Sequence, residues 1–470
     1  MFTAIIGLLA TLVVLSGIAC AFRAAQTART PQGAVGWVVF LLSAPYVAVP
    51  LYLILGHHRF RGYVISRRES HRVLAALKVF ATRFAPEPGA TDVDLAPFEK
   101  IARLPAAGGN GVDLLIDGAQ AFPAMFEAID AAQSYVLIQF YIFRDDDLGR
   151  ELRDHLVSAT KRGVHVRMMM DSVGSYGLSR GYIDSMREAG IEVIDRRSSR
   201  GPRLPFQINF RNHRKTVVVD GKTGFTGGLN VGDEYMGRSA RFGPWRDTHI
   251  RLHGPLVTQL QLIFAEDWHW ATGQTLQDAL FWSPERVDDD VTGLIVATGP
   301  ADGVESGSLL FFSAIAEAQE RICIASPYFV PDQDVATALA HAAMRGVDVR
   351  ILVPDVVDHR LPWLAAFAYF DRVRAAGVRV FRYGPGFMHQ KVFVIDDRIA
   401  AIGTTNLDNR SFRLNFEAMA VFFDADVAGH VQEMLRIDLE GATEMDRTLA
   451  EQPLWIRYGA PLARLFSPLL

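Results

Sequence analysis

Two short stretches of this chain carry the same polar residues at the same spacing. The sequence "NHRKTVVVDGKTGFTGGLN" runs from Asn212 to Asn230, and "MHQKVFVIDDRIAAIGTTN" runs from Met388 to Asn406. Each stretch contains His-x-Lys, four residues, Asp, six residues and then Gly-x-x-Asn. The repeated set gives six candidate catalytic residues, which are His213, Lys215, Asp220, His389, Lys391 and Asp396.

These residue types suit chemistry at a phosphate group. Residues two apart in a strand point to the same face, so each histidine projects together with the lysine that follows it. The ammonium group can hold anionic oxygens, and the imidazole can act as a nucleophile or as a proton donor near neutral pH. A single His-x-Lys would be read as a solvated strand edge, but two matched copies argue against that reading. If the two sets face each other, they supply a nucleophile and an acid for in-line displacement at a phosphodiester.

Other polar residues near the two stretches are candidates for binding substrate. The amides of Asn230 and Asn406 would add neutral donors beside each His-Lys pair. Arg211 and Arg214 belong to a basic stretch that has no acidic residue between Arg196 and Val219. A solvated basic loop is the plain interpretation, but beside a phosphate site the stretch is better explained as attracting an anionic substrate. Nucleic acid would also fit this charge pattern.

A working histidine usually has an acceptor that orients it. Asp247 in "WRDTHIRL" follows the first stretch, and Glu417 in "RLNFEA" holds the comparable place after the second. We expect each carboxylate to orient the histidine of its own copy, with surface ion pairs as the alternative. Asp220 and Asp396 stand at turn signals, so a structural role is at least as good an interpretation for them as a chemical one.

The elements that must position these residues follow one alternating pattern twice. The strand "YVLIQFYIF", the helix "ELRDHLVSATKRG" and the strand "VHVRMMMD" return later as "RICIASPYF", "VATALAHAAMRG" and "VDVRILVPD". This internal duplication predicts an α/β protein with two similar mixed-sheet domains, at residues 111–270 and 293–470, joined by a linker at 271–292. The second domain ends in an amphipathic tail, "WIRYGAPLARLFSPLL", which could lie on a membrane surface, although packing on the domain is the commoner role.

The N-terminal part predicts a membrane anchor. No charged residue occurs in 2–22 or in 34–56, and each run is long enough to cross a bilayer as a helix. We therefore expect a two-helix transmembrane hairpin at residues 1–56, followed by a juxtamembrane connector at 57–110. A cleaved signal peptide is the alternative, but no basic side chain precedes the first run. More arginines follow the second run than lie between the runs, which favours catalytic domains on the cytoplasmic side of a multi-pass inner-membrane protein.

The composition fits two or more folded domains and excludes several other classes. The chain has 470 residues, half of them hydrophobic, and a net charge of −4. Its two cysteines, Cys20 and Cys323, cannot build a disulfide framework or a cysteine-based metal site. Nothing in the sequence forms a convincing metal cluster.

The two complete His-x-Lys stretches resemble the phospholipase D superfamily. The wording "NHRKTVVVDGKTGFTGGLNVGDEY" and "TTNLDNRSFRLNFE", with the N-terminal hairpin, is similar to its bacterial cardiolipin synthase branch. That resemblance implies condensation of two phosphatidylglycerol molecules into cardiolipin plus glycerol, through a phosphohistidine, without metal or other cofactor. It also implies that His213 is the nucleophile. Where the superfamily often has Gly-Ser, this chain has Gly227-Gly228 and Gly403-Thr404, which puts a hydroxyl contact in doubt for the first copy.

The expected partners are phosphatidylglycerol, other anionic phospholipids and the membrane, with no nucleic acid. Two other functions stay open at this point. A phospholipase D-type hydrolase or nuclease would use the same residues with water as the acceptor, and a non-catalytic membrane scaffold would use neither histidine. The two intact motifs argue against the scaffold, and the membrane hairpin argues against the nuclease.

Overall fold

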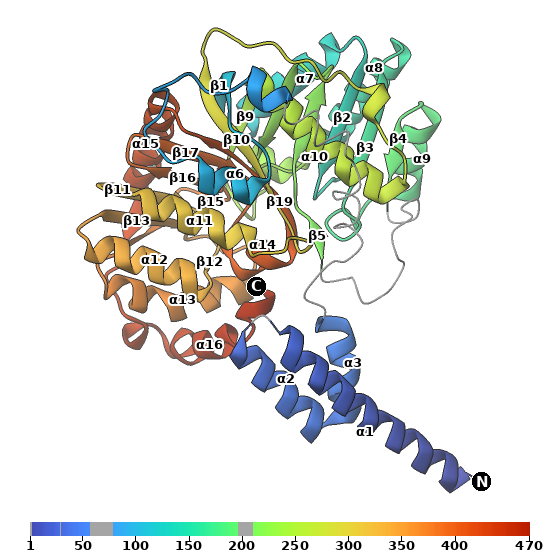
Figure 1. Cartoon of the computed structure of the whole chain (residues 1–470), viewed down its shortest axis with the longest axis vertical. Helices are drawn as coiled ribbons and strands as arrows, with labels where there is room; N and C mark the ends of the chain where they lie inside the picture. The colour runs from blue at the N-terminus through green and yellow to red at the C-terminus, as the bar shows by residue number, and fades with distance from the viewer. Residues whose placement is uncertain (1, 29, 57–78, 196–209) are drawn as a thin grey trace.

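The computed structural model describes residues 2–28, 30–56, 79–195 and 210–470. In these ranges the chain forms a large α/β body and a separate group of N-terminal helices, which lie apart from the body in Figure 1. Two groups of basic residues lie outside the described residues. They are the part of the basic stretch at 196–209, which was predicted to attract an anionic substrate, and the arginines at 59–72, from which the membrane orientation was predicted.

One continuous mixed sheet runs through the body and contains both copies of the predicted repeat. The strands of the first half are β1 (Ala107–Ile116), β2 (Tyr135–Phe140), β3 (His165–Met170), β4 (Glu192–Ile194), β6 (Thr216–Val219), β7 (Thr223–Gly227) and β9 (Thr248–His253). Those of the second half are β10 (Val291–Thr298), β11 (Arg321–Ala325), β13 (Asp348–Pro354), β14 (Arg379–Tyr383), β16 (Val392–Ile395), β17 (Ile399–Gly403), β19 (Asn415–Phe422) and β20 (Ala442–Glu444).

The strand order shows that the two halves are related by an approximate twofold axis. The order β4-β3-β2-β6-β7-β9-β1 in the first half is mirrored as β10-β19-β17-β16-β11-β13-β14 in the second. The halves meet where β1 pairs antiparallel with β10. The predicted fold, with two similar mixed α/β halves, is confirmed.

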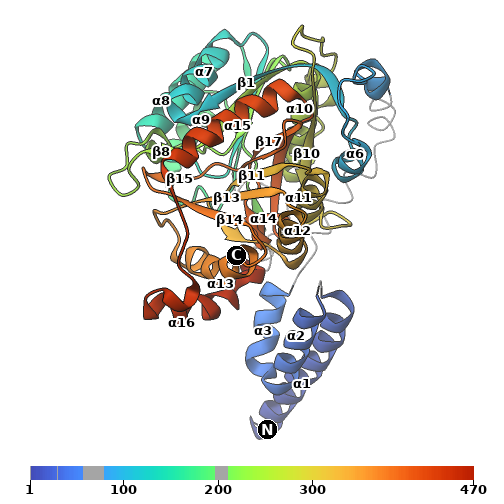
Figure 2. The same cartoon turned by 90° about the vertical axis from the view of Figure 1, so that its left-hand side faces the viewer.

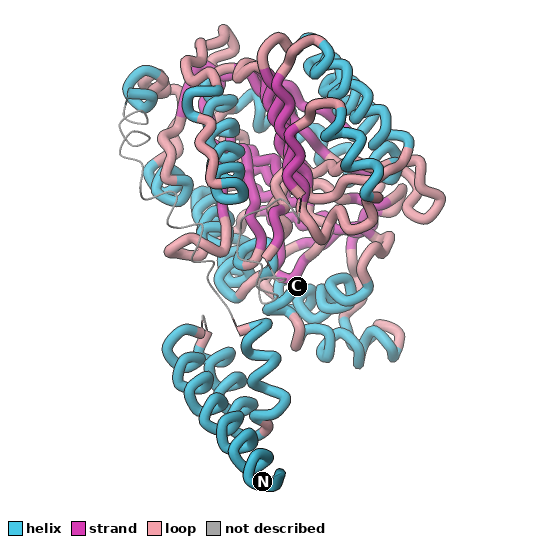
Figure 3. The backbone as a smooth tube through the Cα atoms, turned by 90° about the vertical axis from the view of Figure 1, so that its right-hand side faces the viewer, coloured by secondary structure: helices cyan, strands magenta, loops and turns pink. Residues whose placement is uncertain are grey.

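Helices cover both faces of the sheet, with its strands running through the middle of the body (Figure 3). The covering helices of the first half are α7 (Asp117–Ala131), α8 (Asp147–Lys161) and α9 (Arg180–Glu188), and those of the second are α11 (Ser306–Glu317), α12 (Gln333–Met344) and α13 (Arg360–Arg374). On the other face α10 (Pro255–Thr272) and α15 (Ala425–Glu440) share one core with strands of both halves. Strands β2, β16 and β17 are buried along their whole length, as expected for strands covered on both faces.

The predicted connector is part of the body where it is described. Helix α6 (Ala96–Ala102) places Phe98 in the core of the second half, with its ring 5.0 Å from that of Phe423. Strand β1 begins at Ala107, inside the range predicted as connector. The remaining short elements are β5 (Arg211–Asn212), β8 (Trp245–Arg246), β12 (Phe329–Val330), β15 (Phe387–Met388), β18 (Leu407–Asp408), α14 (Asn409–Arg413), α16 (Leu454–Arg464), η2 (Asp233–Met236), η3 (Gln277–Ala279), η4 (Leu449–Glu451) and η5 (Ser467–Leu469).

The N-terminal helices differ from a simple hairpin. The first apolar run forms one long helix, α1 (Phe2–Thr27), and within the described residues its segment 4–27 is the only one long and apolar enough to cross a membrane. The second run forms two shorter helices, α2 (Pro31–Ser43) and α3 (Pro45–Leu55). The break falls at Ala44, whose φ of −137° and ψ of 57° are not helical, because a residue before proline is disfavoured in the α region. The prediction of two continuous spans is therefore corrected to one long helix and a broken second segment.

Candidate active site

Short strands carry each histidine across to the other half. Strand β5, directly before His213, pairs parallel with the start of β19, and the N–H of His213 donates to the carbonyl of Phe416 over 2.9 Å. Strand β15, directly before His389, pairs in the same way with β8, and the N–H of His389 donates to the carbonyl of Arg246 over 2.8 Å. Each histidine therefore lies beside the carboxylate-bearing strand of the opposite copy.

The orienting carboxylates are crossed between the two halves. His213 donates from Nδ1 to Oε2 of Glu417 over 2.9 Å, and His389 donates from Nδ1 to Oδ2 of Asp247 over 2.8 Å. Because a carboxylate can only accept, each Nδ1 carries the proton and each Nε2 keeps a lone pair. The two residues expected to orient histidines do so, but the expectation that each acts within its own copy is wrong.

The two carboxylates are supported in different ways, which accounts for the departure at Gly228 and Thr404. Thr404 donates from its hydroxyl to Oε2 of Glu417 over 2.5 Å. In the first copy a Cβ on Gly228 would stand only 1.9 Å from Oδ1 of Asp247, so the carboxylate occupies the space that a side chain would need. Asp247 instead receives hydrogen bonds from the N–H of Thr248 and from the indole of Trp245, over 2.9 and 3.3 Å. The hydroxyl contact questioned for the first copy is therefore replaced by other donors.

The two lysines are buried beside the histidines, where their charge is costly. Lys215 donates to the carbonyl of His213 over 2.7 Å, and Lys391 lies with Nζ 2.9 Å from Nε2 of His389. Burial, and then the charge of Lys391, lower the pKa of Lys215 to about 7. Burial lowers the pKa of Lys391 to about 8, against the opposing effect of Asp247 and Glu417. An anion bound between the two ammonium groups would relieve this desolvation.

The histidines are neutral near pH 7 for the same physical reason. Burial, followed by the charge of Lys391, lowers the pKa of His389 to about 4, although the hydrogen bond to Asp247 acts in the opposite direction. Burial also lowers the pKa of His213, opposed by Glu417. Burial alone would raise the pKa values of Asp247 and Glu417, but the histidines and lysines hold both below their usual range. The site thus contains two anionic carboxylates facing two basic pairs.

Aromatic rings hold both imidazoles in place. The ring of Tyr141 meets that of His213 edge-on at a centroid distance of 4.9 Å, and the ring of Trp245 lies 5.2 Å from that of His389. Tyr235 is a third ring on the His389 side, 6.3 Å away. These side chains limit the rotation of each imidazole about its hydrogen bond to the carboxylate.

The two asparagines differ in how they are engaged. Asn230 accepts from the N–H of Ile142 over 3.1 Å and donates to the hydroxyl of Tyr235 over 3.0 Å, so both ends of its amide are engaged within the protein. Asn406 is buried, and its Oδ1 has no hydrogen-bond partner among the residues that the structure describes. Of the two predicted substrate-binding amides, Asn406 thus has a buried polar atom that is not used by the described protein, although this atom is the acceptor oxygen.

Asp220 and Asp396 are hydrogen-bonded within turns. Both residues have positive φ, 52° and 51°. The carboxylate of Asp220 accepts from the N–H groups of residues 133–135 over 2.8–2.9 Å, and that of Asp396 accepts from residues 319–321 over the same range. Both carboxylates are thus engaged with the start of the neighbouring strand. Of the two interpretations left open for these residues, the contacts favour the structural one.

Arg214 is also corrected, and two aspartates that the sequence reasoning missed explain why. The Arg214 side chain is buried and donates to Oδ1 of Asp267, on α10, over 2.7 Å, so it is not placed to bind substrate. In the second copy the equivalent Gln390 donates to Asp438, on α15, over 2.7 Å. The middle residue of each His-x-Lys is therefore tied to a long central helix. Both helices carry more than one acidic residue, so the sequence alone did not single out Asp267 or Asp438.

Arg211 remains compatible with its predicted role. It is half-buried, donates to the carbonyl of Phe210 over 2.9 Å, and lies beside Tyr141, whose pKa burial raises while Arg211 lowers it. No group of three His, Cys, Asp or Glu that could hold a metal ion occurs within the described ranges.

Comparisons with known proteins match this sequence to one family. The family model described as "Cardiolipin synthase, PLD-like domain" matches residues 125–268 and 311–438. The chain is 44% identical to cardiolipin synthase A of Pseudomonas fluorescens, over 99% of this chain and 98% of that protein. It is 43% identical to cardiolipin synthase A of Pseudomonas aeruginosa, over 100% of this chain and 97% of that protein.

A solved structure shares the fold at much lower identity. The phosphatidylserine synthase of Haemophilus influenzae superposes with a TM-score of 0.63 at 14% identity, covering 80% of this chain and 99% of that one. From the match of both repeats and the identity along its whole length, this chain belongs to the cardiolipin synthase family with phospholipase D-like domains.

Proposed function

We propose that the protein is a membrane phosphatidyltransferase that condenses two phosphatidylglycerol molecules into cardiolipin and glycerol. The observation that carries the proposal is the pair of crossed His–carboxylate contacts, each with a buried lysine beside it. A nucleophile and an acid on opposite sides of a phosphate are what a two-step transfer needs. Sequence identity of 43–44% to two cardiolipin synthases, over nearly the whole chain, supports the choice of lipid.

The first step forms a covalent intermediate. Nε2 of His213, whose lone pair is exposed because Nδ1 donates to Glu417, attacks the phosphorus of the first phosphatidylglycerol. The bond from phosphorus to the glycerol oxygen breaks, and that oxygen takes a proton from Nε2 of His389. Glycerol leaves, and the phosphatidyl group stays on His213. The negative phosphate raises the pKa of His389 in the complex, so this histidine can hold the proton that it donates.

The second step reverses these roles. The terminal hydroxyl of a second phosphatidylglycerol gives its proton to His389 and attacks the phosphorus, the bond to His213 breaks, and cardiolipin leaves. Lys215 and Lys391 neutralise the non-bridging oxygens in both steps. The amide of Asn406 is the neutral donor that we assign to the same oxygens. The assignment of His213 rather than His389 as nucleophile follows the family resemblance.

The protein acts at the inner membrane, with α1 as the anchor. Its segment 4–27 can cross the bilayer, and the broken second segment would return the chain or lie against the first helix. We place the catalytic body on the cytoplasmic side from the arginine distribution. The expected lipids are phosphatidylglycerol and other anionic phospholipids, and nucleic acid is not a substrate in this proposal.

The decisive measurement is the ratio of cardiolipin to phosphatidic acid at early times, in vesicles of labelled phosphatidylglycerol. We expect cardiolipin to dominate, added glycerol to drive the reaction backwards, and dialysis against a strong chelator to leave turnover largely intact. Dominant phosphatidic acid at high lipid density would identify a hydrolase, the second candidate function. No turnover by the wild type and by His213→Ala and His389→Ala alike would favour a scaffold.

A further inference from the structure

Helix α16, near the C-terminus, has an apolar face that nothing in the described part of the body covers. Its inner stripe, Ile456, Ala460 and Ala463, is buried against the domain. The outer stripe recurs at the helical spacing of three or four residues and consists of Leu454, Tyr458, Leu462 and Leu465, with Trp455 and Phe466 beside it. Tyr458 and Leu465 are 65% and 75% exposed. A contiguous apolar stripe of this size on a surface marks an interaction site.

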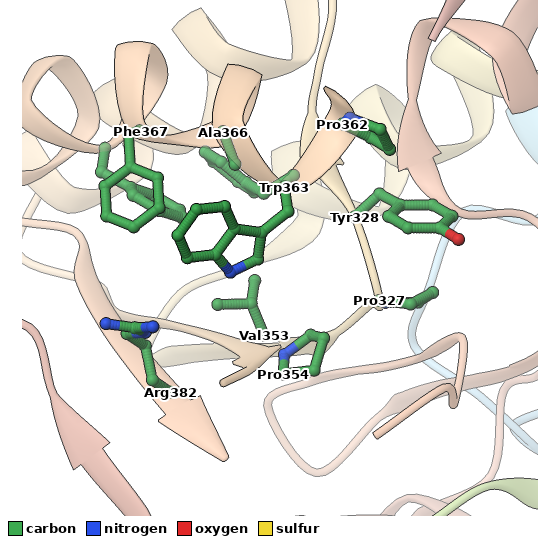
Figure 4. A pocket seen from close by; sticks show the side chains of 11 residues that line it. Pro327, Tyr328, Val353, Pro354, Pro362, Trp363, Ala366, Phe367 and Arg382 are labelled. Atoms are coloured by element: carbon green, nitrogen blue, oxygen red, sulfur yellow. The ribbon is translucent and has the colours of Figure 1, made fainter. Parts of the chain in front are cut away.

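Helix α16 packs against α13, which fixes the direction of its outer face. Trp455 stacks on Trp363 of α13 with a centroid distance of 5.7 Å and an interplanar angle of 17°. Figure 4 shows Trp363 projecting from α13 toward Val353 and Pro354, the last two residues of β13. The cavity left around it is about 20 Å³, room for a single water and far too small for an acyl chain. The outer stripe of α16 remains exposed and is available to a partner outside the body.

The end of the chain links this helix to the active site. The carbonyls of Leu469 and Leu470 accept hydrogen bonds from the Arg410 guanidinium and the Arg410 backbone N–H, over 2.9 and 2.6 Å. Arg410 lies in α14, four residues after Asn406 of the second motif. Tyr369 of α13 donates from its hydroxyl to Ser467 over 2.9 Å, which fixes the same segment from the other side. The segment that follows α16 is thus hydrogen-bonded to α14, which follows the second motif directly in the chain.

The charge and the location of the helix single out one kind of occupant. Arg457 and Arg464 flank the stripe and are exposed, and no acidic residue follows Glu451 in the chain. Trp and Tyr beside arginines on an apolar helix are typical of the boundary between acyl chains and headgroups. In Figures 1 and 2, α16, the C-terminus and α14 lie at the end of the body nearest to α1–α3. Helix α16 and the membrane-spanning helix are therefore at the same end of the body.

We propose that α16 is an interfacial helix that rests its outer stripe in the surface of an anionic bilayer and so holds the mouth of the active site at the level of the lipid headgroups. The proposal rests on the proposed function in taking a lipid surface as the occupant. Its first test measures docking and needs no turnover, so that this proposal and the proposed function can fail separately, and the second test applies once turnover is established.

The test uses the full-length chain with a single environment-sensitive fluorophore. In a Cys20→Ala background, Cys323 stays unlabelled near neutral pH because burial raises its pKa to about 12. The probe is attached at Leu462→Cys, and at Met344→Cys on α12 as the control, since both side chains are well exposed, Leu462 at 63% and Met344 at 74%. The proteins are reconstituted into vesicles of phosphatidylglycerol and phosphatidylethanolamine that carry nitroxide lipids.

We expect the probe at position 462 to be quenched several-fold more strongly than the probe at 344, with a blue-shifted emission. Equal quenching at the two positions would overturn the proposal. So would quenching at 462 that depends on protein density instead of nitroxide content, because that would identify a second copy of the chain as the partner.

A variant gives an independent readout. Leu462→Glu with Leu465→Glu should lower the ratio of turnover on vesicles to turnover in detergent–lipid micelles several-fold, whereas Met344→Glu should leave this ratio unchanged. An unaltered ratio in the double variant, at normal thermal stability, would contradict the proposal.

Discussion

Asp247 accepts a hydrogen bond of 2.8 Å from Nδ1 of His389, a residue 142 positions later in the chain and in the other half of the fold. The reciprocal contact joins His213 to Glu417 over 2.9 Å. Neither half therefore contains a complete histidine–carboxylate pair. This arrangement makes the active site a property of the assembled twofold body, held together by the pairing of β1 with β10 and of the short strands that precede each histidine.

The crossing predicts which variants share a defect. A phosphodiester with a p-nitrophenolate leaving group needs no proton from the enzyme in the first step. With His213 as nucleophile, Asp247→Asn should therefore behave like His389→Ala and recover release of p-nitrophenol, while Glu417→Gln should behave like His213→Ala and stay inactive. On phosphatidylglycerol each variant should lose about 10²–10⁴-fold in kcat.

The measurement is the burst of p-nitrophenol for all four variants. Pairing within each copy would instead group Asp247→Asn with His213→Ala. If His389 were the nucleophile, Asp247→Asn and His389→Ala would be the inactive pair, and Glu417→Gln and His213→Ala would release p-nitrophenol. The experiment therefore tests which carboxylate acts with which histidine separately from which histidine is the nucleophile.

The sequence was sufficient to predict the duplicated fold and both motifs, because periodicity and matched spacing are local properties. The crossing was not predictable in this way, since it depends on two-residue strands such as β5 and β8 that pair across the halves. Arg214 was misinterpreted for a related reason. Its buried partner, Asp267, is 53 residues away on α10, and positive charge alone does not reveal whether a side chain is already engaged. Pro45 broke the second apolar run, although proline is tolerated in many membrane helices.

Binding of an anion at the site should take up protons above pH 7. In the free protein the pKa of Lys215 is about 7 and that of Lys391 about 8, so both lose protons as the pH rises through this range. An anion between them raises both pKa values, and affinity should therefore fall as the pH increases above 7. Titration calorimetry with sulfate, which does not itself titrate here, in two buffers of different ionisation enthalpy at pH 8 should show uptake of about one proton.

The control for this linkage is Lys215→Gln, which should remove most of the uptake. The lowered pKa of Lys215 also makes the free energy of unfolding depend on pH. The pKa of Lys215 falls from 10.5 to about 7 on folding, so the unfolded chain binds more protons between these values. The contribution of Lys215 to the free energy of unfolding should then rise with pH from about 7 to 10.5 and be constant below 7. Sulfate affinity that does not change between pH 6 and 9 would contradict the lysine assignment.

Asp220 and Asp396 should matter for stability and little for the chemical step. Each accepts hydrogen bonds from three consecutive backbone N–H groups, so Asp220→Ala should lower the free energy of unfolding by about 1–3 kcal/mol. Asp220→Asn should cost less, because asparagine tolerates positive φ and keeps one acceptor oxygen. Denaturant unfolding and kcat at a temperature where each variant is folded are the measurements. A loss of kcat comparable to that of His213→Ala, at normal stability, would restore a catalytic role.

The difference between Gly228 and Thr404 gives a test of how tightly each carboxylate is held. A Cβ on Gly228 would come within 1.9 Å of Oδ1 of Asp247, and the carboxylate cannot yield without loosening its hydrogen bond to His389. Gly228→Ala should therefore reduce turnover of phosphatidylglycerol in the same way as Asp247→Asn, and release of p-nitrophenol should again be spared.

Position 404 offers the matched comparison, because the Thr404 hydroxyl donates to Glu417 and space for a side chain already exists there. Thr404→Ser keeps this donor and should be nearly neutral, whereas Thr404→Val removes it and should slow the step that depends on His213. If Gly228→Ala is as active as the wild type, the carboxylate of Asp247 can shift without cost, and the hydrogen bond to His389 is not what sets the rate.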